Sequence, residues 1–180
     1  MTRITRLLIV DIMMTGLIGM GGPVIAASGD GLAIDRVRSS NAVIVKVLKE
    51  ASDRSRTFRG LVETIKASDG TVYVEEGKCG YGVRACLVTV TMAGANRNLW
   101  VKVDTRLADC ELMELIGHEL QHTIEVLGDR TVTNGFALYY FFLKEGSRSK
   151  GLAFETDAAI AVGETVRAEV RKYGSCSQAR

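Results

Sequence analysis

The stretch Leu115-Ile-Gly-His118-Glu119-Leu-Gln-His122-Thr-Ile124 belongs to the segment that decides the fold of this chain. Apolar residues recur there with a helical period, which predicts a helix from about Asp109 to the stop signal Gly128. The apolar stripe of this helix consists of Met113, Ile116, Leu120 and Leu127. Its two histidines stand four residues apart, so they project from one face about one turn apart. Both imidazoles can then reach one tetrahedral Zn²⁺ ion.

Three strands are predicted before this helix, because apolar residues alternate with other residues over 72–75, 86–91 and 99–103. They are expected to form a small, largely antiparallel sheet. A helix is predicted from Ser55 to near Gly70. Its apolar face consists of Phe58, Leu61, Val62 and Ile65.

Two further helices are predicted after the motif, over residues 136–143 and from about 154 to 173. Residues 42–51 fit either a helix or a strand, because their valines alternate, and both alternatives stay open. No internal repeat or linker divides the chain. The expected fold class is therefore α+β.

The residues His118-Glu119-Leu120-Gln121-His122 resemble the HExxH signature of the zincin metallopeptidases. No Pro interrupts the motif, an apolar Ile124 follows it, and these are the only two histidines in the chain. The resemblance covers about a quarter of the chain. It implies a zincin-like fold, in which a small sheet packs with the HExxH helix and a C-terminal helix. It also implies a Zn²⁺ cofactor held by His118 and His122, with Glu119 as the catalytic base.

A zincin needs a third protein ligand, and the identity of that ligand separates the branches of the family. The metzincin continuation requires Gly, and then His or Asp, at the places that Glu125 and Gly128 hold here, so that branch is excluded. The gluzincins, of which thermolysin is a member, take a Glu from a later helix. Glu155 follows His122 by 33 residues and matches that distance.

Glu155 also leads an apolar stripe of the predicted last helix, formed by Ala159, Val162, Val166 and Val170. A carboxylate at the head of a buried stripe is costly unless it is paired or bound to metal. We therefore predict Glu155 as the third ligand, with Asp157 next in order. Glu125 shares the histidine face but stands two turns from His118, which makes it a strained third ligand. Thermolysin-like enzymes orient the first His with an Asp, and Ala159 occupies that place here.

The resemblance implies a peptidase acting on a peptide or protein substrate. Glu119 would take a proton from a water at the zinc and pass it to the leaving amine. Tyr139 and Tyr140 are candidates for the group that stabilises the oxyanion. Trp100 and Lys102 share one face of the strand before the motif helix, where zincins often pair the substrate backbone with a sheet edge.

Residues 1–26 have the layout of a secretory signal peptide. Arg3 and Arg6 precede an apolar run over 7–20, and Ala26-Ala27 offers a small-residue cleavage site. Asp11 inside that run is unusual for a signal peptide and for a transmembrane anchor alike. We expect residues 27–180 to form a single zincin-like metallopeptidase domain. It would be secreted or periplasmic, with no stable membrane insertion after cleavage.

All four cysteines lie in the expected mature part, and an even count in an exported protein favours disulfides. Three pairings are possible. The most local one joins Cys79 to Cys86 and leaves Cys110 to pair with Cys176. A cysteine zinc site is disfavoured, because such sites use closely spaced ligand pairs.

The charge of the chain gives no support for a nucleic-acid partner, because 23 Lys and Arg against 21 Asp and Glu leave a net charge of only +2. Two other function classes stay open. One is a zinc-binding, non-catalytic domain that encloses the metal. The other is a disulfide-held interaction domain of the cell envelope, in which the motif is a coincidence. The sequence carries no signal for an oligomeric state.

Overall fold

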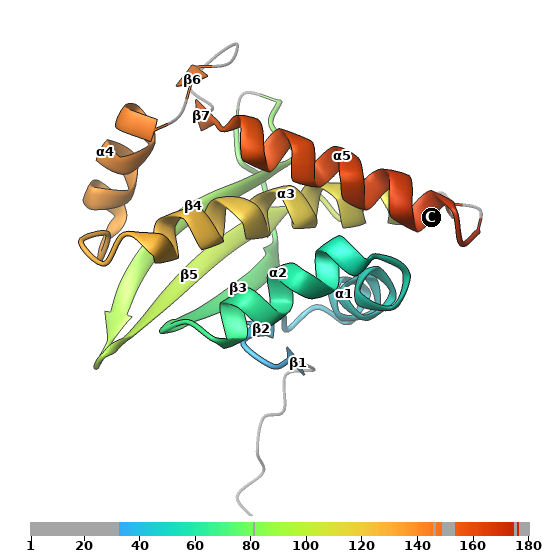
Figure 1. Ribbon diagram of the computed structural model, residues 1–180, viewed down its shortest axis with the longest axis horizontal. Coiled ribbons are helices and arrows are strands. Elements are labelled where there is room, and N and C mark those ends of the chain that lie inside the picture. Colours follow the sequence, from blue (N-terminus) through green and yellow to red (C-terminus); the bar gives the residue numbers. More distant parts are fainter. Residues whose placement is uncertain (1–32, 81, 146, 149–153, 175, 177–180) are drawn as a thin grey trace, which may run out of the picture.

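The computed structural model describes residues 33–80, 82–145, 147–148, 154–174 and 176 (Figure 1). The expected signal peptide, residues 1–26, lies outside this range. The helices are α1 (Ala42–Arg54), α2 (Arg56–Lys66), α3 (Asp109–Gly128), α4 (Gly135–Glu145) and α5 (Asp157–Arg171). The strands are β1 (Ala33–Ile34), β2 (Val37–Arg38), β3 (Gly70–Glu76), β4 (Ala85–Ala93), β5 (Asn96–Val103), β6 (Ser147–Arg148) and β7 (Phe154–Glu155). The described part is therefore α+β, as predicted.

The segment that the sequence left open is helix α1. Its buried residues are Ile44, Val47, Leu48 and Ala51, which recur at the spacing of a helix rather than of a strand. Asn41 caps the helix, because its side chain accepts the N–H groups of Val43 and Ile44. The alternating valines are thus divided between the buried and the exposed side of a helix.

The main sheet is mixed, so the expectation of a largely antiparallel sheet is wrong in part. Its strand order is β1-β2-β3-β5-β4. β4 and β5 form an antiparallel hairpin whose turn contains Gly94 with a positive φ of 63°. β5 returns into the space beside β3 and pairs with it in parallel. Consequently β4, and not β5, is the edge strand on this side of the sheet.

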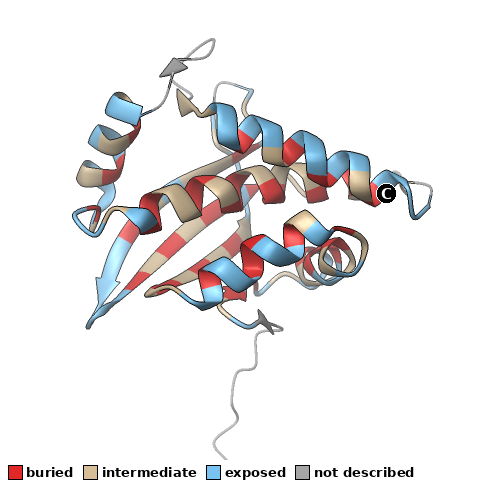
Figure 2. Ribbon diagram, in the orientation of Figure 1, coloured by how far each residue is buried: buried red, intermediate tan, exposed pale blue. Residues whose placement is uncertain are grey.

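The helices gather on one face of the sheet, with α3 lying across its strands and α5 alongside α3 (Figure 1). Buried positions follow the sheet-facing side of α2 and α3, as Figure 2 shows. Leu112, Met113, Ile116 and Leu120 of α3 are almost fully buried. Because α3 is covered by the sheet on one side and by α5 on another, its histidine face is also partly enclosed.

Two glycines let α3 and α5 approach closely. A Cβ at Gly117 would stand 3.0 Å from Val166, and a Cβ at Gly163 would stand 3.3 Å from the Cβ of His118. Carbon atoms in ordinary contact are about 3.5–4.0 Å apart. The N-terminal half of α5 is therefore held against His118 of α3.

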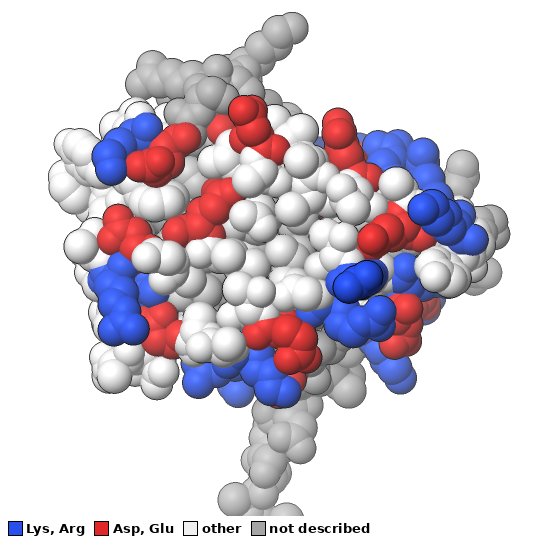
Figure 3. All heavy atoms as spheres, in the orientation of Figure 1, with Lys and Arg blue, Asp and Glu red and all other residues white. Residues whose placement is uncertain are grey.

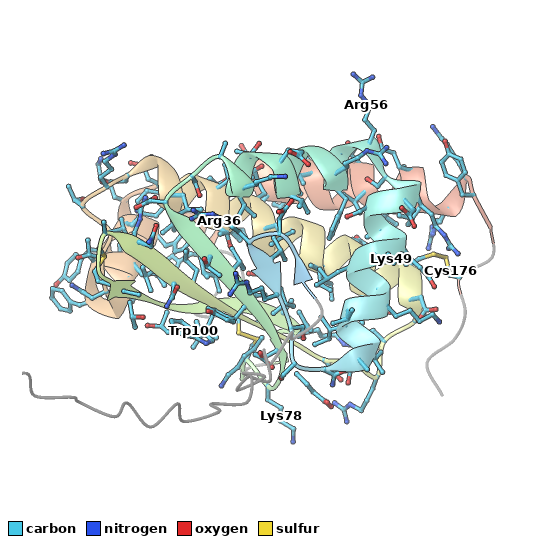
Figure 4. The ribbon with its side chains drawn as sticks, turned by 90° about the horizontal axis from the view of Figure 1, so that it is seen from below. Arg36, Lys49, Arg56, Lys78, Trp100 and Cys176 are labelled. Atoms are coloured by element: carbon cyan, nitrogen blue, oxygen red, sulfur yellow. A yellow bond between two sulfur atoms is a disulfide. The ribbon has the colours of Figure 1, made fainter. Side chains whose placement is uncertain are left out.

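The disulfides follow the most local pairing of the four cysteines, Cys79–Cys86 and Cys110–Cys176. The second bond ties the start of α3 to the chain after α5 (Figure 4). No helix among the described residues is long and apolar enough to cross a membrane. On the face shown in Figure 3, acidic and basic side chains are interspersed.

Candidate metal centre

The structure brings His118, His122 and Glu155 together. The Nε2 atom of His118 lies 2.8 Å from Oε2 of Glu155, and Nε2 of His122 lies 3.7 Å from the same oxygen. The two imidazole rings are 4.7 Å apart between centroids. One ligand atom from each residue lies within 4.8 Å of the others, so this group can hold a metal ion.

Glu155 comes from a different element than the sequence predicted. It lies on the short strand β7, which pairs with β6, and helix α5 begins only at Asp157. The prediction that Glu155 leads the stripe of the last helix is therefore wrong, although Ala159, Val166 and Val170 of that stripe are buried. The position of Glu155 is instead set by Thr156, which caps α5 by accepting the N–H of Ala159. Asp157, the second choice for a ligand, is exposed and is not part of the group.

Glu125 has a function in this centre that the sequence argument missed. Its Oε2 lies 3.1 Å from Nδ1 of His122, on the ring side opposite the nitrogen that faces Glu155. Its Oε1 accepts hydrogen bonds from Thr156 at 2.8 Å and from Gln121 at 3.3 Å. One carboxylate therefore connects a candidate ligand on α3 to the residue next to Glu155. The spacing of three residues from His122, on the same helix face, was the signal available in the sequence.

Glu119 is the most deeply buried acidic group of the centre, with 5% of its surface exposed. Burial raises the pKa of its carboxyl, which the nearby histidines and a hydrogen bond from the backbone of Leu87 partly oppose. A carboxylate with a raised pKa is a stronger proton acceptor than an exposed one. Glu119 thus has the environment of a general base.

His122 and Glu155 stabilise opposite charges on each other. Burial lowers the pKa of His122, but hydrogen bonds to Glu125 and Glu155 outweigh it and bring this pKa to about 9. Burial raises the pKa of Glu155, but hydrogen bonds to His118 and His122 outweigh it and bring this pKa to about 2. A metal ion that binds His122 and Glu155 would displace the proton from the ring nitrogen of His122 that faces Glu155.

A cavity of about 230 Å³ opens beside the group, with Glu119, His122 and Glu155 in its wall. The rest of its wall is mainly apolar and comes from the segment before β4, from β4 itself, from α4 and from β7. Neither Tyr139 nor Tyr140 belongs to the described lining. Both are about half exposed on α4. The cavity gives a ligand access to the side of the group where Glu119 lies.

Trp100 and Lys102 do not have the position expected of a substrate-binding edge. Both lie on β5, which is paired on either side by β3 and β4. The Trp100 ring stacks on Tyr73 with 5.3 Å between centroids (Figure 4). The expectation is wrong because the strand closest to the motif in sequence is a central strand of the sheet.

No family model, no curated protein and no solved structure matches this chain. The function must therefore be inferred from the geometry of the site itself.

Proposed function

We propose that this protein is an exported zinc-dependent peptidase of the zincin type, which hydrolyses peptide bonds with a metal-activated water. The observation that carries the proposal is the convergence of His118, His122 and Glu155 within 4.8 Å, with the buried Glu119 in the wall of the same cavity. The spacing of the motif predicts two of these ligands. The third comes from a separate element, which a chance occurrence of the motif would not supply.

The donor set suits zinc. Two imidazole nitrogens and one carboxylate oxygen are the protein ligands of many catalytic zinc sites, which keep a fourth position for water or substrate. Zinc held by His118, His122 and Glu155 would lower the pKa of water towards neutrality and would polarise a carbonyl group. The adjacent cavity is the reason to favour an open, catalytic site over a closed, structural one.

The residues of the chain divide the remaining work. Glu119 accepts a proton from water and returns it to the leaving amine, for which its raised pKa is suited. Glu125 fixes the ring of His122 by binding Nδ1, which leaves Nε2 for the metal. Phe142 packs on the same ring with 5.1 Å between centroids and further restricts its movement.

The proposed compartment rests on the cysteines and on the N-terminal sequence. Both disulfides would persist only in an oxidising environment. The signal-like layout of residues 1–26 agrees with export to the periplasm or the medium.

The proposal is tested on protein purified without a His tag, because the histidines of a tag would themselves bind zinc. Wild type should contain about one zinc per chain, which a chelator removes. Glu155→Ala should weaken zinc binding strongly, because a site with two protein ligands loses a charge partner and a coordination position. Glu164→Ala is the control, because this residue is exposed on α5 and lies outside the group. Equal zinc affinity of the two variants would contradict the assignment of the third ligand.

Catalysis is tested separately with Glu119→Gln, which keeps the size of the side chain but removes the base. Zinc content should stay close to wild type, while hydrolysis of a mixed peptide library falls by about 10² to 10⁴. Cleavage is measured by mass spectrometry. If wild type binds zinc but cleaves no peptide, the protein is a zinc-binding, non-catalytic domain instead.

A further inference from the structure

Two stretches of the chain outside the metal centre carry no charged residue. One covers residues 85–96 and contains β4, and the other covers residues 131–143 and contains most of α4. Charged residues make up 24% of the chain, and no other uncharged run among the described residues is longer than seven. The fold places the two stretches side by side at one end of the molecule, because α4 packs against β4 (Figure 2). Charge is therefore missing from one continuous part of the protein.

The surface formed by β4 and α4 is apolar as well as uncharged. Eight large apolar side chains are exposed among the described residues, and five of them lie on these two elements, namely Val88, Met92, Phe136, Tyr139 and Tyr140. The ring centroids of Phe136 and Tyr140 are 4.6 Å apart, and those of Tyr139 and Tyr140 are 5.8 Å apart. Contiguous exposed apolar surface of this kind marks a site of association.

This surface is separate from the metal centre. The residues of β4 and α4 that line the cavity beside the centre include Leu87 and Phe142, which are half-buried and buried respectively. The exposed side chains of the two elements do not belong to the described lining.

Strand β4 also offers backbone hydrogen-bonding groups at its outer edge. It is the last strand of the order β1-β2-β3-β5-β4, so among the described residues it pairs with β5 alone. Proteins usually protect such an edge with charged residues, with Pro or with a very short strand. β4 has nine residues, none of which is charged or Pro. Its register shift lies between Leu87 and Thr89, so residues 89–93 form a regular strand that can accept another strand.

These features favour a second copy of this chain as the partner. A lipid bilayer would cover the aromatic rings but has no hydrogen-bonding groups in its hydrocarbon core for the strand edge. A short extended peptide would pair with β4 but would leave the rings of α4 uncovered. In a two-fold symmetric pair, a residue near the axis faces its own copy, so a charged residue there would meet a like charge. A surface without charges is free of this repulsion.

We infer that the protein forms a symmetric dimer in which the β4 strands of two copies pair in antiparallel orientation. The two main sheets then join into one continuous sheet, and both copies of α4 lie on the same face of it. The exposed rings of α4 are covered where the two copies of this helix meet. The inference goes beyond the proposed function, because it uses the exposed sides of these elements and neither the metal nor the cavity.

The test is sedimentation velocity of the oxidised mature chain over a series of micromolar concentrations, which measures the dissociation constant of the dimer. Wild type should sediment as a dimer. Val88→Lys and Phe136→Lys each place two like charges in the interface, one from each copy. Each variant should raise the dissociation constant at least about tenfold.

The controls match these substitutions in residue type and exposure. Val43→Lys on α1 is the control for Val88→Lys, because the two valines are 50% and 42% exposed. Tyr173→Lys, after the end of α5, is the control for Phe136→Lys, because these rings are 71% and 72% exposed. Both controls should keep the dissociation constant of wild type. Far-UV circular dichroism shows whether each variant is folded, and since the test variants lie on different elements, one that does not fold leaves the other to decide.

The outcomes are distinct from those that test the peptidase. A higher dissociation constant in the folded test variants, with both controls unchanged, supports the dimer. A wild type that stays monomeric at every concentration overturns it, whether or not that monomer binds phospholipid vesicles or a peptide. An effect of only one of two folded test variants, or an equal effect of the controls, also overturns it. Zinc binding and peptide cleavage are measured separately, so failure of the dimer leaves the proposed function standing.

Discussion

Replacing Arg97 by Met should remove a large part of the stability of this domain. Arg97 lies on the central strand β5, and only 1% of its surface is exposed. Its guanidinium forms two bonds with the carboxylate of Asp69, at 2.8 and 2.9 Å. It also donates to four backbone carbonyls at and beyond the C-terminal end of α3, those of Val126, Leu127, Asp129 and Val132.

The position of these carbonyls explains why the charge is tolerated inside the protein. The C-terminal end of a helix carries a partial negative charge and unpaired carbonyl groups. Helix α3 has no basic residue in its own last turn. Arg97 supplies the missing donors from the sheet and thereby fixes one end of the motif helix against β5.

The size of the effect follows from the deleted contacts. Hydrogen bonds to charged groups contribute about 1.5–3 kcal/mol each, and six of them would exceed the whole stability of many domains if they were additive. Contacts that share one guanidinium are not additive. Removal of one partner from a buried ion pair costs about 3–5 kcal/mol, and the lower end of that range applies here because Asp69, the carboxylate left behind, is 39% exposed. Met retains the apolar stem, so packing changes little.

The measurement is urea unfolding of the oxidised protein, followed by the fluorescence of Trp100, the only tryptophan. Arg106→Met is the control, because Arg106 also binds a carboxylate at two points, that of Asp104, but is 76% exposed. The control should leave the unfolding midpoint nearly unchanged. A loss below about 1 kcal/mol for Arg97→Met would refute the conclusion that this arginine holds α3 on the sheet.

Three further predictions concern the metal centre, the disulfides and acid stability. Glu125→Ala should weaken zinc binding about 10- to 100-fold in chelator competition, because the ring of His122 loses the contact that orients it. An unchanged zinc affinity would contradict a positioning role of Glu125. Thiol titration of the denatured, non-reduced protein should find no free cysteine. Removing Cys110–Cys176, which closes a loop of 66 residues, should cost roughly 4 kcal/mol in urea unfolding. The salt bridge lowers the pKa of Asp69 from 3.8, so its contribution is present above about pH 4 and is lost in more acidic solution. The stability difference between wild type and Asp69→Asn should therefore narrow as the pH falls below 4, and a constant difference would argue against the pair.

Local patterns in the sequence were sufficient for several elements. The apolar period predicted α2 and α3, because burial of one helix face requires that spacing wherever the helix packs. The alternation around Val72, Leu99 and Val101 predicted strands that bury one face, and these residues are fully buried. The spacing of His118 and His122 predicted that they share a face, since both positions belong to one rigid helix.

The order of the strands in the sheet could not be predicted from the same patterns. Alternation shows that a strand has one buried face, but the backbone hydrogen bonds that join strands are the same for every residue type. The sequence therefore did not indicate that β5 would lie between β3 and β4. For the same reason, Trp100 was expected at the edge of the sheet, but the edge strand is β4 and Trp100 lies on the central strand β5.

The sequence by itself determined the motif helix and the two histidines of the candidate centre, because their geometry depends on helix periodicity alone. Only the tertiary structure decided the rest of the site. Glu155 reaches the histidines from a strand, through the close approach of α5 at Gly163 and the bridge from Glu125 to Thr156. These contacts join residues that are more than 30 positions apart in the chain, and no local periodicity encodes the distance between separate elements.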